Sequence, residues 1–180
     1  MQQLVCTIDT SSMIALDHLG LMPQLSLIFS RVLLPKAVRT ELFRRRNMKD
    51  RVRAILRDYA FIEPCDAYDK ATVEVLLIER AKLGDQDRGE VEAVVQAAEI
   101  GTMVIVDDRW GRELAALHGR DFHGTLRVLR RLLELEHASP AVTRDRLVEL
   151  FRRGIRLPLR EVNAFLAEIG EPPNAKAGDT

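Results

Sequence analysis

Short apolar runs alternate with longer stretches of helical periodicity along most of the chain. Buried strands are predicted over Leu4–Ile8, Val32–Leu34 and Met103–Val106, because each run is mostly apolar and too short for a helix. Phe61–Ile62 is a weaker strand candidate. Strands that alternate with helices are typical of a parallel sheet covered on both faces. We therefore expect a Rossmann-type three-layer α/β/α fold with a mainly parallel central sheet.

Apolar residues that recur three and four positions apart predict the helices between these strands. The clearest helix is Arg88–Ile100, which Gly101 closes. The other predicted helices cover residues 13–19, Pro23–Phe29, Lys36–Arg46, Asp50–Tyr59, Ala71–Lys82, Gly111–His118 and Thr125–Glu136.

Two more helices, Arg144–Arg153 and Arg160–Ile169, follow Ser139-Pro140, which suits a helix start. No strand is predicted after them. We therefore expect an α/β domain over residues 1–138 and a C-terminal helical extension packed on it over residues 139–170. The tail, residues 171–180, is rich in proline and small polar residues and is expected to be disordered.

The composition is that of a globular protein, with 47% hydrophobic and 30% charged residues among 180. The formal net charge is zero, so any nucleic-acid surface must come from local clusters of basic side chains. No run reaches the ~18 apolar residues that span a bilayer. The start, Met1-Gln2-Gln3, lacks the features of a signal peptide, so we expect a cytoplasmic protein with no membrane contact.

Two glutamates are predicted on the apolar side of their helices. Glu90 shares its face with apolar side chains three, four and seven positions later, and Glu41 with apolar side chains three and four positions earlier. An ionised carboxylate there is costly unless it is paired or binds a metal. Glu92, with Gln96 and Glu99, is predicted on the opposite, solvated face. Either inward glutamate alone could also be a helix-end acid bonded to water or to an arginine.

Aspartates follow two of the predicted strands, Asp9 after the first and Asp107-Asp108 after Met103–Val106. Ligands of parallel α/β sheets bind beyond the carboxyl ends of strands, although Asp9 and Asp108 could simply cap the next helices. If the acids converge with Glu41 and Glu90 on one pocket, they repel one another unless a cation is bound. Oxygen ligands favour Mg²⁺ or Mn²⁺.

The ordered set of these motifs resembles the PIN domain, and within it the bacterial and archaeal branch often named DUF3368. The resemblance runs from about Leu4 to about Glu171. Its motifs are Ile8-Asp9-Thr10-Ser11, Leu34-Pro35 followed by Glu41, Gly89-Glu90 at a helix start, Asp107-Asp108-x-x-Gly111-Arg112, and Gly124-Thr125-Leu126.

The resemblance implies a metal-dependent nuclease, and many bacterial relatives are VapC-like toxins of toxin–antitoxin pairs. The family's acidic quartet falls on Asp9, Glu41, Glu90 and either Asp107 or Asp108. We expect Asp9 as the central metal ligand, with Asp108 or Asp107 as its partner. Glu41 and Glu90 would bind through water or orient the nucleophile. The chain departs from the usual pattern because Glu90 replaces an aspartate and Asp107-Asp108 replaces Thr-x-Asp.

The expected substrate is single-stranded RNA, contacted by Ser11, Arg45 and Arg46. Arg45 and Arg46 belong to a basic cluster that follows Glu41, while aromatic residues make up only 5% and no stacking platform is visible. A cognate antitoxin and a homodimer are the other expected partners.

The main alternative is a catalytically weak or inactive PIN-like module that binds nucleic acid or protein. Two other Rossmann-like functions fit less well. A haloacid-dehalogenase-type phosphatase needs a second aspartate where Ser11 stands, and a dinucleotide-binding enzyme needs a glycine-rich turn after the first strand.

Overall fold

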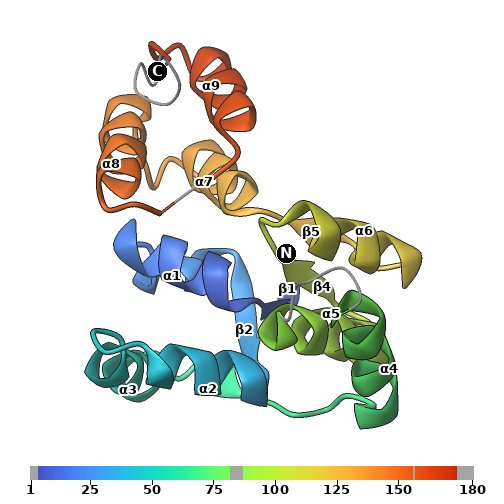
Figure 1. Ribbon diagram of the computed structural model, residues 1–180. Coiled ribbons are helices and arrows are strands. Elements are labelled where there is room, and N and C mark those ends of the chain that lie inside the picture. Colours follow the sequence, from blue (N-terminus) through green and yellow to red (C-terminus); the bar gives the residue numbers. More distant parts are fainter. Residues whose placement is uncertain (1–3, 82–86, 156, 174–180) are drawn as a thin grey trace.

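The computed structural model describes residues 4–81, 87–155 and 157–173. Within them, a parallel five-stranded sheet has the order β3-β2-β1-β4-β5 (Figure 1). The order reverses between β1 and β4, which makes their carboxyl ends a topological switch point. The strands are β1 (Leu4–Ile8), β2 (Phe29–Leu34), β3 (Ile62–Pro64), β4 (Met103–Ile105) and β5 (Phe122–His123).

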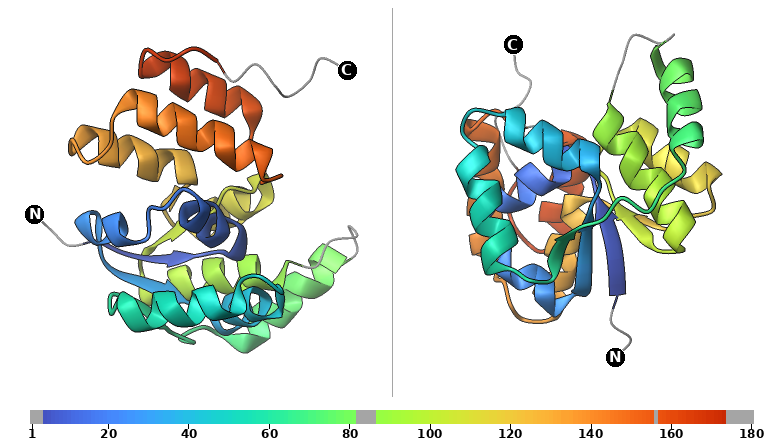
Figure 2. Two further views of the ribbon diagram at one scale, coloured as in Figure 1. Left: turned by 90° about the vertical axis from the view of Figure 1, so that its left-hand side faces the viewer. Right: turned by 90° about the horizontal axis from the view of Figure 1, so that it is seen from below.

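Helices cover both faces of the sheet, as predicted. In the left view of Figure 2, the orange to red helices α7–α9 lie on one side of the sheet and the green helix α5 lies on the other. The helices are α1 (Thr10–His18), the 3-10 helix η1 (Pro23–Leu27), α2 (Lys36–Arg44), α3 (Lys49–Asp58), α4 (Lys70–Ala81), α5 (Arg88–Ile100), α6 (Arg109–Leu117), α7 (Thr125–Glu134), α8 (Pro140–Arg152) and α9 (Leu159–Glu168).

Alternation along the central strands assigns each side chain to a layer. Cys6 and Ile8 of β1 are fully buried in the larger hydrophobic cluster, which includes α1 and α7–α9. Thr7 points the other way, and its hydroxyl donates to the carbonyl of Ala93 in α5 at 2.8 Å. Val104 of β4 packs with Ala93 in a second cluster between α5 and α6. Both faces of the sheet are therefore covered by helices and shielded from water, which explains why its strands are continuous runs of apolar residues.

The C-terminal helices are packed onto the α/β core. Leu150 of α8 and Phe165 of α9 are buried in the same cluster as Ile8 and Met13. The division at residue 138 stays a prediction. Of the predicted disordered tail, residues 174–180 lie outside the described residues. None of the described helices is long and apolar enough to cross a membrane.

The predicted elements match the observed ones closely, and the differences have simple causes. The predicted helix Pro23–Phe29 is a 3-10 helix that ends at Leu27, because Phe29 already belongs to β2. Strand β5 was not predicted, since two residues carry no readable alternation. Gly84, the predicted stop of the helix over Ala71–Lys82, lies outside the described residues.

The predicted solvated face of the central helix is wrong. Glu92 and Gln96 are only 2% and 0% exposed, whereas Glu99 is exposed. The reason is that α5 lies in the middle of its layer and contacts α2, α4 and α6. Glu92 is compensated by the N–H of Ala37 at the start of α2, at 2.7 Å, and by Arg88 at 2.9 Å. The periodicity of the sequence identified the apolar face of α5, but it could not show that neighbouring helices also cover its polar face.

The shared cluster predicts that α8 unfolds together with the sheet. Leu150→Ala should lower the free energy of unfolding by roughly 2 to 5 kcal/mol, because Leu150 is 1% exposed and its truncation leaves a cavity. Val142→Ala on the same helix is the control, since Val142 is 47% exposed. Urea unfolding is followed by circular dichroism and by fluorescence of Trp110 in α6, the chain's single tryptophan.

Both probes should report one transition, displaced equally by Leu150→Ala. A loss of helical signal that precedes any change at Trp110 would show that the C-terminal helices form a separate cooperative unit.

Candidate active site

The carboxyl ends of β1 and β4 lie side by side, and each leads into an aspartate. Ile8 pairs with Ile105, and the N–H of Asp9 continues the ladder by donating to the carbonyl of Ile105 at 3.1 Å. Asp107 follows two residues after β4. The parallel arrangement thus brings together two acids that are almost one hundred residues apart in the chain.

Asp9 is held rigidly at the start of α1 and is 4% exposed. Its Oδ1 accepts the N–H of Ser12 at 2.9 Å, and its Oδ2 accepts the N–H of Ser11 at 3.3 Å and the Ser11 hydroxyl. Asp9 therefore caps α1, as one of the two alternatives predicted, and lies beside Asp107 at the strand ends; its role as a metal ligand stays a prediction. Ser11, which the sequence predicts to contact RNA, thus donates both its N–H and its hydroxyl to Asp9.

Asp107 is tied to the same network through hydroxyl groups. Its Oδ1 accepts the N–H of Thr125 at 2.8 Å, and its Oδ2 accepts the hydroxyl of Ser12 at 3.2 Å and that of Thr125. Ser12 thus joins Asp9 to Asp107. Asp108 differs, because it is exposed and caps α6 by accepting the N–H of Trp110 at 2.8 Å.

Glu41 connects α2 to the starts of α1 and α5. Its Oε2 accepts the hydroxyl of Thr10, and its Oε1 accepts the N–H of Gly89 at 2.8 Å. A Cβ at position 89 would lie 2.7 Å from both Glu41 Oε2 and Thr10 Oγ1. The glycine of the Gly89-Glu90 motif is therefore required by the close approach of Glu41.

Glu90 is the least compensated acid of the cluster. It is 5% exposed, and its Oε1 has no hydrogen-bond partner among the described residues. Its carboxylate lies against α6, where a Cβ at Gly111 would stand 2.0 Å from Oε1. Gly111 is thus a glycine because this acid needs the space. The inward placement predicted for Glu90 is confirmed.

Burial and mutual repulsion raise the pKa values of three of these acids. The pKa of Glu90 is raised to about 8, first by burial and then by the charges of Asp108 and Asp9. Burial raises the pKa of Asp9 to about 6 against the opposing hydrogen bonds from Ser11 and Ser12, and Asp107 adds repulsion. The pKa of Asp107 is also raised by burial. The site therefore disfavours its own ionised form, which a nearby cation would correct.

The oxygen atoms of these acids suit a divalent cation, although the side chains do not surround a common point. No three acid, histidine or cysteine side chains among the described residues stand in a metal-holding arrangement. Asp9 and Asp107 instead point at hydroxyl and N–H donors. The Oε1 of Glu90, however, is buried and has no hydrogen-bond donor among the described residues. Asp9, Asp108, Asp107 and Glu90 offer only oxygen atoms, which fits Mg²⁺ or Mn²⁺.

A cavity of about 560 Å³ opens beside Asp107 and Asp108, but Asp9, Glu41 and Glu90 are not among the residues that line it. Asp107, Asp108, Ser11 and Arg45 line it, together with the segment around Pro158 between α8 and α9. Arg45 is therefore brought to the site. Arg46 is exposed and does not line this cavity, so the structure does not bring it together with the acids.

The sequence did not identify Thr10, Ser12 and Thr125 as site residues. All three are buried, and their hydroxyls hold Glu41 and Asp107. The signal was present, because each follows directly on a strand end at a helix start. It could not be separated from ordinary helix capping without knowing which strands are neighbours.

Because folding raises the pKa of Glu90, the folded state loses stability as this group ionises. Glu90 should favour the folded state below its ordinary pKa near 4.5, and this contribution should disappear as the pH rises toward about 8. In EDTA, Glu90→Gln should therefore be more stable than the parent by roughly 4 to 5 kcal/mol at pH 8.5 and similar to it at pH 4.5.

Urea unfolding at several pH values measures this difference. Glu99→Gln, on the exposed part of the same helix, is the matched control and should follow the parent. Parallel stability profiles for Glu90→Gln and the parent would contradict the placement of an ionisable, poorly compensated Glu90.

Comparison with known proteins agrees with this geometry. The PIN-domain family model DUF3368 matches residues 5–171, which is nearly the whole chain and includes the C-terminal helices. None of the curated proteins compared with the chain matches it. PIN domains are generally nucleases and typically use divalent metal ions, so the match supports a hydrolase with a nuclease-like fold. The sheet order, the acids at its switch point and this match together show that the chain belongs to the PIN-domain family.

Proposed function

We propose that this protein is an endoribonuclease that depends on Mg²⁺ or Mn²⁺ and hydrolyses phosphodiester bonds of single-stranded RNA. The observation that carries the proposal is the buried Glu90 carboxylate, which has an unpartnered oxygen and shares the switch point with Asp9 and Asp108. A PIN-domain fold with every acidic position filled favours catalysis over a module that only binds.

Different side chains of the site would perform different parts of such a reaction. When bound, a divalent cation supplies an activated water and neutralises charge on the phosphate. Asp9, fixed by Ser11 and Ser12, offers a rigid ligand, and Glu90 and Asp108 can complete the set. Glu41, held between Thr10 and Gly89, is positioned to orient water at the edge of the cluster.

Because the chain has no net charge, RNA must be bound by particular basic side chains and not by the overall charge of the protein. Arg45 lines the cavity above Asp107 and Asp108, so it can contact a backbone phosphate next to the acids. A homodimer and a cognate antitoxin remain part of the proposal, and only the likeness to VapC-like toxins supports them.

A binding module without turnover is the second candidate. The observation that favours it is that Asp9 and Asp107 are engaged by protein donors, and no three ligating side chains are arranged around a common point in the described residues. The two candidates differ in whether a bound cation rearranges these side chains, which the nuclease requires and the binding module does not.

Asp9→Asn should lower metal-dependent cleavage of single-stranded RNA on the order of a hundredfold or more, because it removes a ligand charge and keeps the size of the side chain. Glu41→Gln and Glu90→Gln should also lower the rate. Cleavage of a fluorescent single-stranded RNA in Mn²⁺ and in EDTA measures the effect. Asp50→Asn, whose side chain is 95% exposed, is the control.

A purified, folded protein that cleaves no RNA in either metal would support the binding module. Equal cleavage by Asp9→Asn and the parent would mean that the activity belongs to a contaminant or that the site is elsewhere.

Mn²⁺ should stabilise the parent, because a bound cation relieves the repulsion between Asp9, Glu90 and Asp108. At an ion concentration about 100 times its Kd, the melting temperature should rise by about 5 to 10 °C. Thermal unfolding followed by circular dichroism measures the shift. Asp9→Asn should reduce it strongly and Asp50→Asn should retain it. An equal rise in Asp9→Asn would place the cation away from this cluster.

A further inference from the structure

Three cavities follow one another along the C-terminal helices and share lining residues. The cavity above the acids shares Asp107, Arg109 and Pro158 with a second cavity of about 390 Å³. The second shares Arg112, Phe122 and Glu161 with a third of about 500 Å³ between α7 and α9. The groove, as defined by these three cavities, runs from the acidic site past β5 to α7.

We infer that this groove carries the single-stranded RNA away from the cleavage site and that its far end is a nucleotide subsite built from Phe122, His123 and Arg127. This inference rests on the proposed function, because it names the path of that substrate. It also gives the C-terminal helices a role, since α9 forms one wall of the groove.

Arginines line the groove along its whole length, as a phosphate backbone requires. Arg45 and Arg109 lie at the acidic end, Arg112 lies at the junction of the second and third cavities, and Arg127 and Arg130 lie at the far end. Five acids line the same cavities, so the groove has no net positive charge and individual arginines must make the phosphate contacts. These acids are Asp107, Asp108, Glu113, Glu161 and Glu168.

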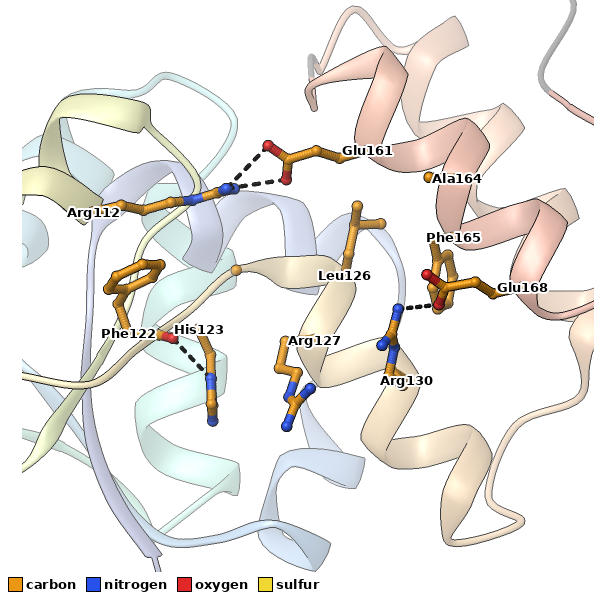
Figure 3. Close-up of a pocket in the computed structure, with 11 residues that line it drawn as sticks. Arg112, Phe122, His123, Leu126, Arg127, Arg130, Glu161, Ala164, Phe165 and Glu168 are labelled. Carbon is orange, nitrogen blue, oxygen red and sulfur yellow. Dashed lines mark hydrogen bonds and ion pairs between the residues drawn. The ribbon is translucent and has the colours of Figure 1, made fainter.

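Ion pairs fix two of these arginines to α9. Arg112 donates to both carboxylate oxygens of Glu161, at 3.1 and 3.0 Å, and Arg130 pairs with Glu168 (Figure 3). Both pairs span from the α/β core to α9 and keep the walls of the groove together. Because the walls are held by side-chain pairs, we expect an extended single strand and not a duplex to enter.

Arg127 differs from its neighbours because its charge is not neutralised. It is exposed, it has no ion pair among the described residues, and its guanidinium lies between His123 and Arg130 at the pocket (Figure 3). A free guanidinium beside the walls of a cavity is suited to a phosphate.

Phe122 offers a surface on which a base can stack, and His123 offers it a hydrogen-bond acceptor. The Phe122 ring is at the wall shared by the second and third cavities, and the residue is 39% exposed, which is unusual for a phenylalanine. The Nδ1 of His123 lies 2.8 Å from the carbonyl of Phe122, so Nδ1 carries a proton and Nε2 is left as an acceptor in the neutral ring. An aromatic face, an acceptor and a free guanidinium together match one nucleotide.

The size of each cavity agrees with this occupant. All three fall within the roughly 300 to 1,000 Å³ that is typical of small-ligand sites. The aromatic platform that composition did not reveal is thus a single phenylalanine, made accessible by the short strand β5 at the edge of the sheet.

The test is RNA binding in an Asp9→Asn background, which keeps the RNA intact whether or not the parent is active. Fluorescence anisotropy with a labelled single-stranded RNA in EDTA gives Kd at several salt concentrations. Phe122→Ala should raise Kd about tenfold without changing the salt dependence, because it removes stacking. Arg127→Ala should raise Kd several-fold and reduce the slope of log Kd against log salt by about one, because it removes one phosphate contact.

Arg53→Ala is the matched control. Arg53 lies on α3, is 59% exposed in its side chain and lies outside the groove, so its loss should leave the Kd nearly unchanged. The exposure of Arg127 makes Arg127→Ala safe for the fold, so the test does not depend on Phe122→Ala folding. Crosslinking of 4-thiouridine RNA, mapped by mass spectrometry, should label the segment 122–130.

Unchanged affinity in both Phe122→Ala and Arg127→Ala, with crosslinks elsewhere, would overturn the groove while leaving the nuclease proposal intact. That outcome would leave the groove to another occupant, such as a partner protein. Absence of any RNA binding by the Asp9→Asn protein and of any cleavage by the parent would instead defeat the proposed function, and the groove's assignment with it.

Discussion

The structure depends on the burial of like charges where β1 and β4 end. Asp9, Glu90 and Asp107 are brought together at this switch point, and burying them costs free energy because each loses water, Asp107 repels Asp9, and Asp9 repels Glu90. Hydrogen-bond donors from the surrounding helices offset part of that cost. The starts of α1 and α7 direct N–H groups and hydroxyls at Asp9 and Asp107, so the helices begin where the acids need donors.

Glycines complete this arrangement by making room. Glu41 can reach the start of α5 only because position 89 has no side chain, and Glu90 can lie against α6 only because position 111 has none. The motif glycines thus serve the acids and not a turn. Among the described residues of this cluster, the Oε1 of Glu90 is a buried carboxylate oxygen without a hydrogen-bond donor, and it is the feature on which the proposed cation site rests.

The C-terminal helices contribute both to the hydrophobic core and to the wall of a cavity. Their inner faces fill the hydrophobic cluster shared with α1 and β1, while the outer edge of α9 reaches Arg112 and Arg130 across the groove. A protein of zero net charge can bind a polyanion if its arginines gather along one path and its acids lie elsewhere or pair with them. The two glutamates of α9 hold Arg112 and Arg130 in place and also neutralise their charge.

The sequence by itself determined the alternation of strands and helices, the inward placement of Glu41 and Glu90, and the acids at strand ends, because these follow from periodicities of two and 3.6 residues. It did not determine that Glu92 and Gln96 are buried, since burial of a helix on all sides depends on neighbours far along the chain. Nor did it show that Ser12 joins Asp9 to Asp107, or that Phe122, Arg127 and Glu161 share one groove. Those contacts depend on the order of strands in the sheet and on how α9 folds back, and only the tertiary structure decides both.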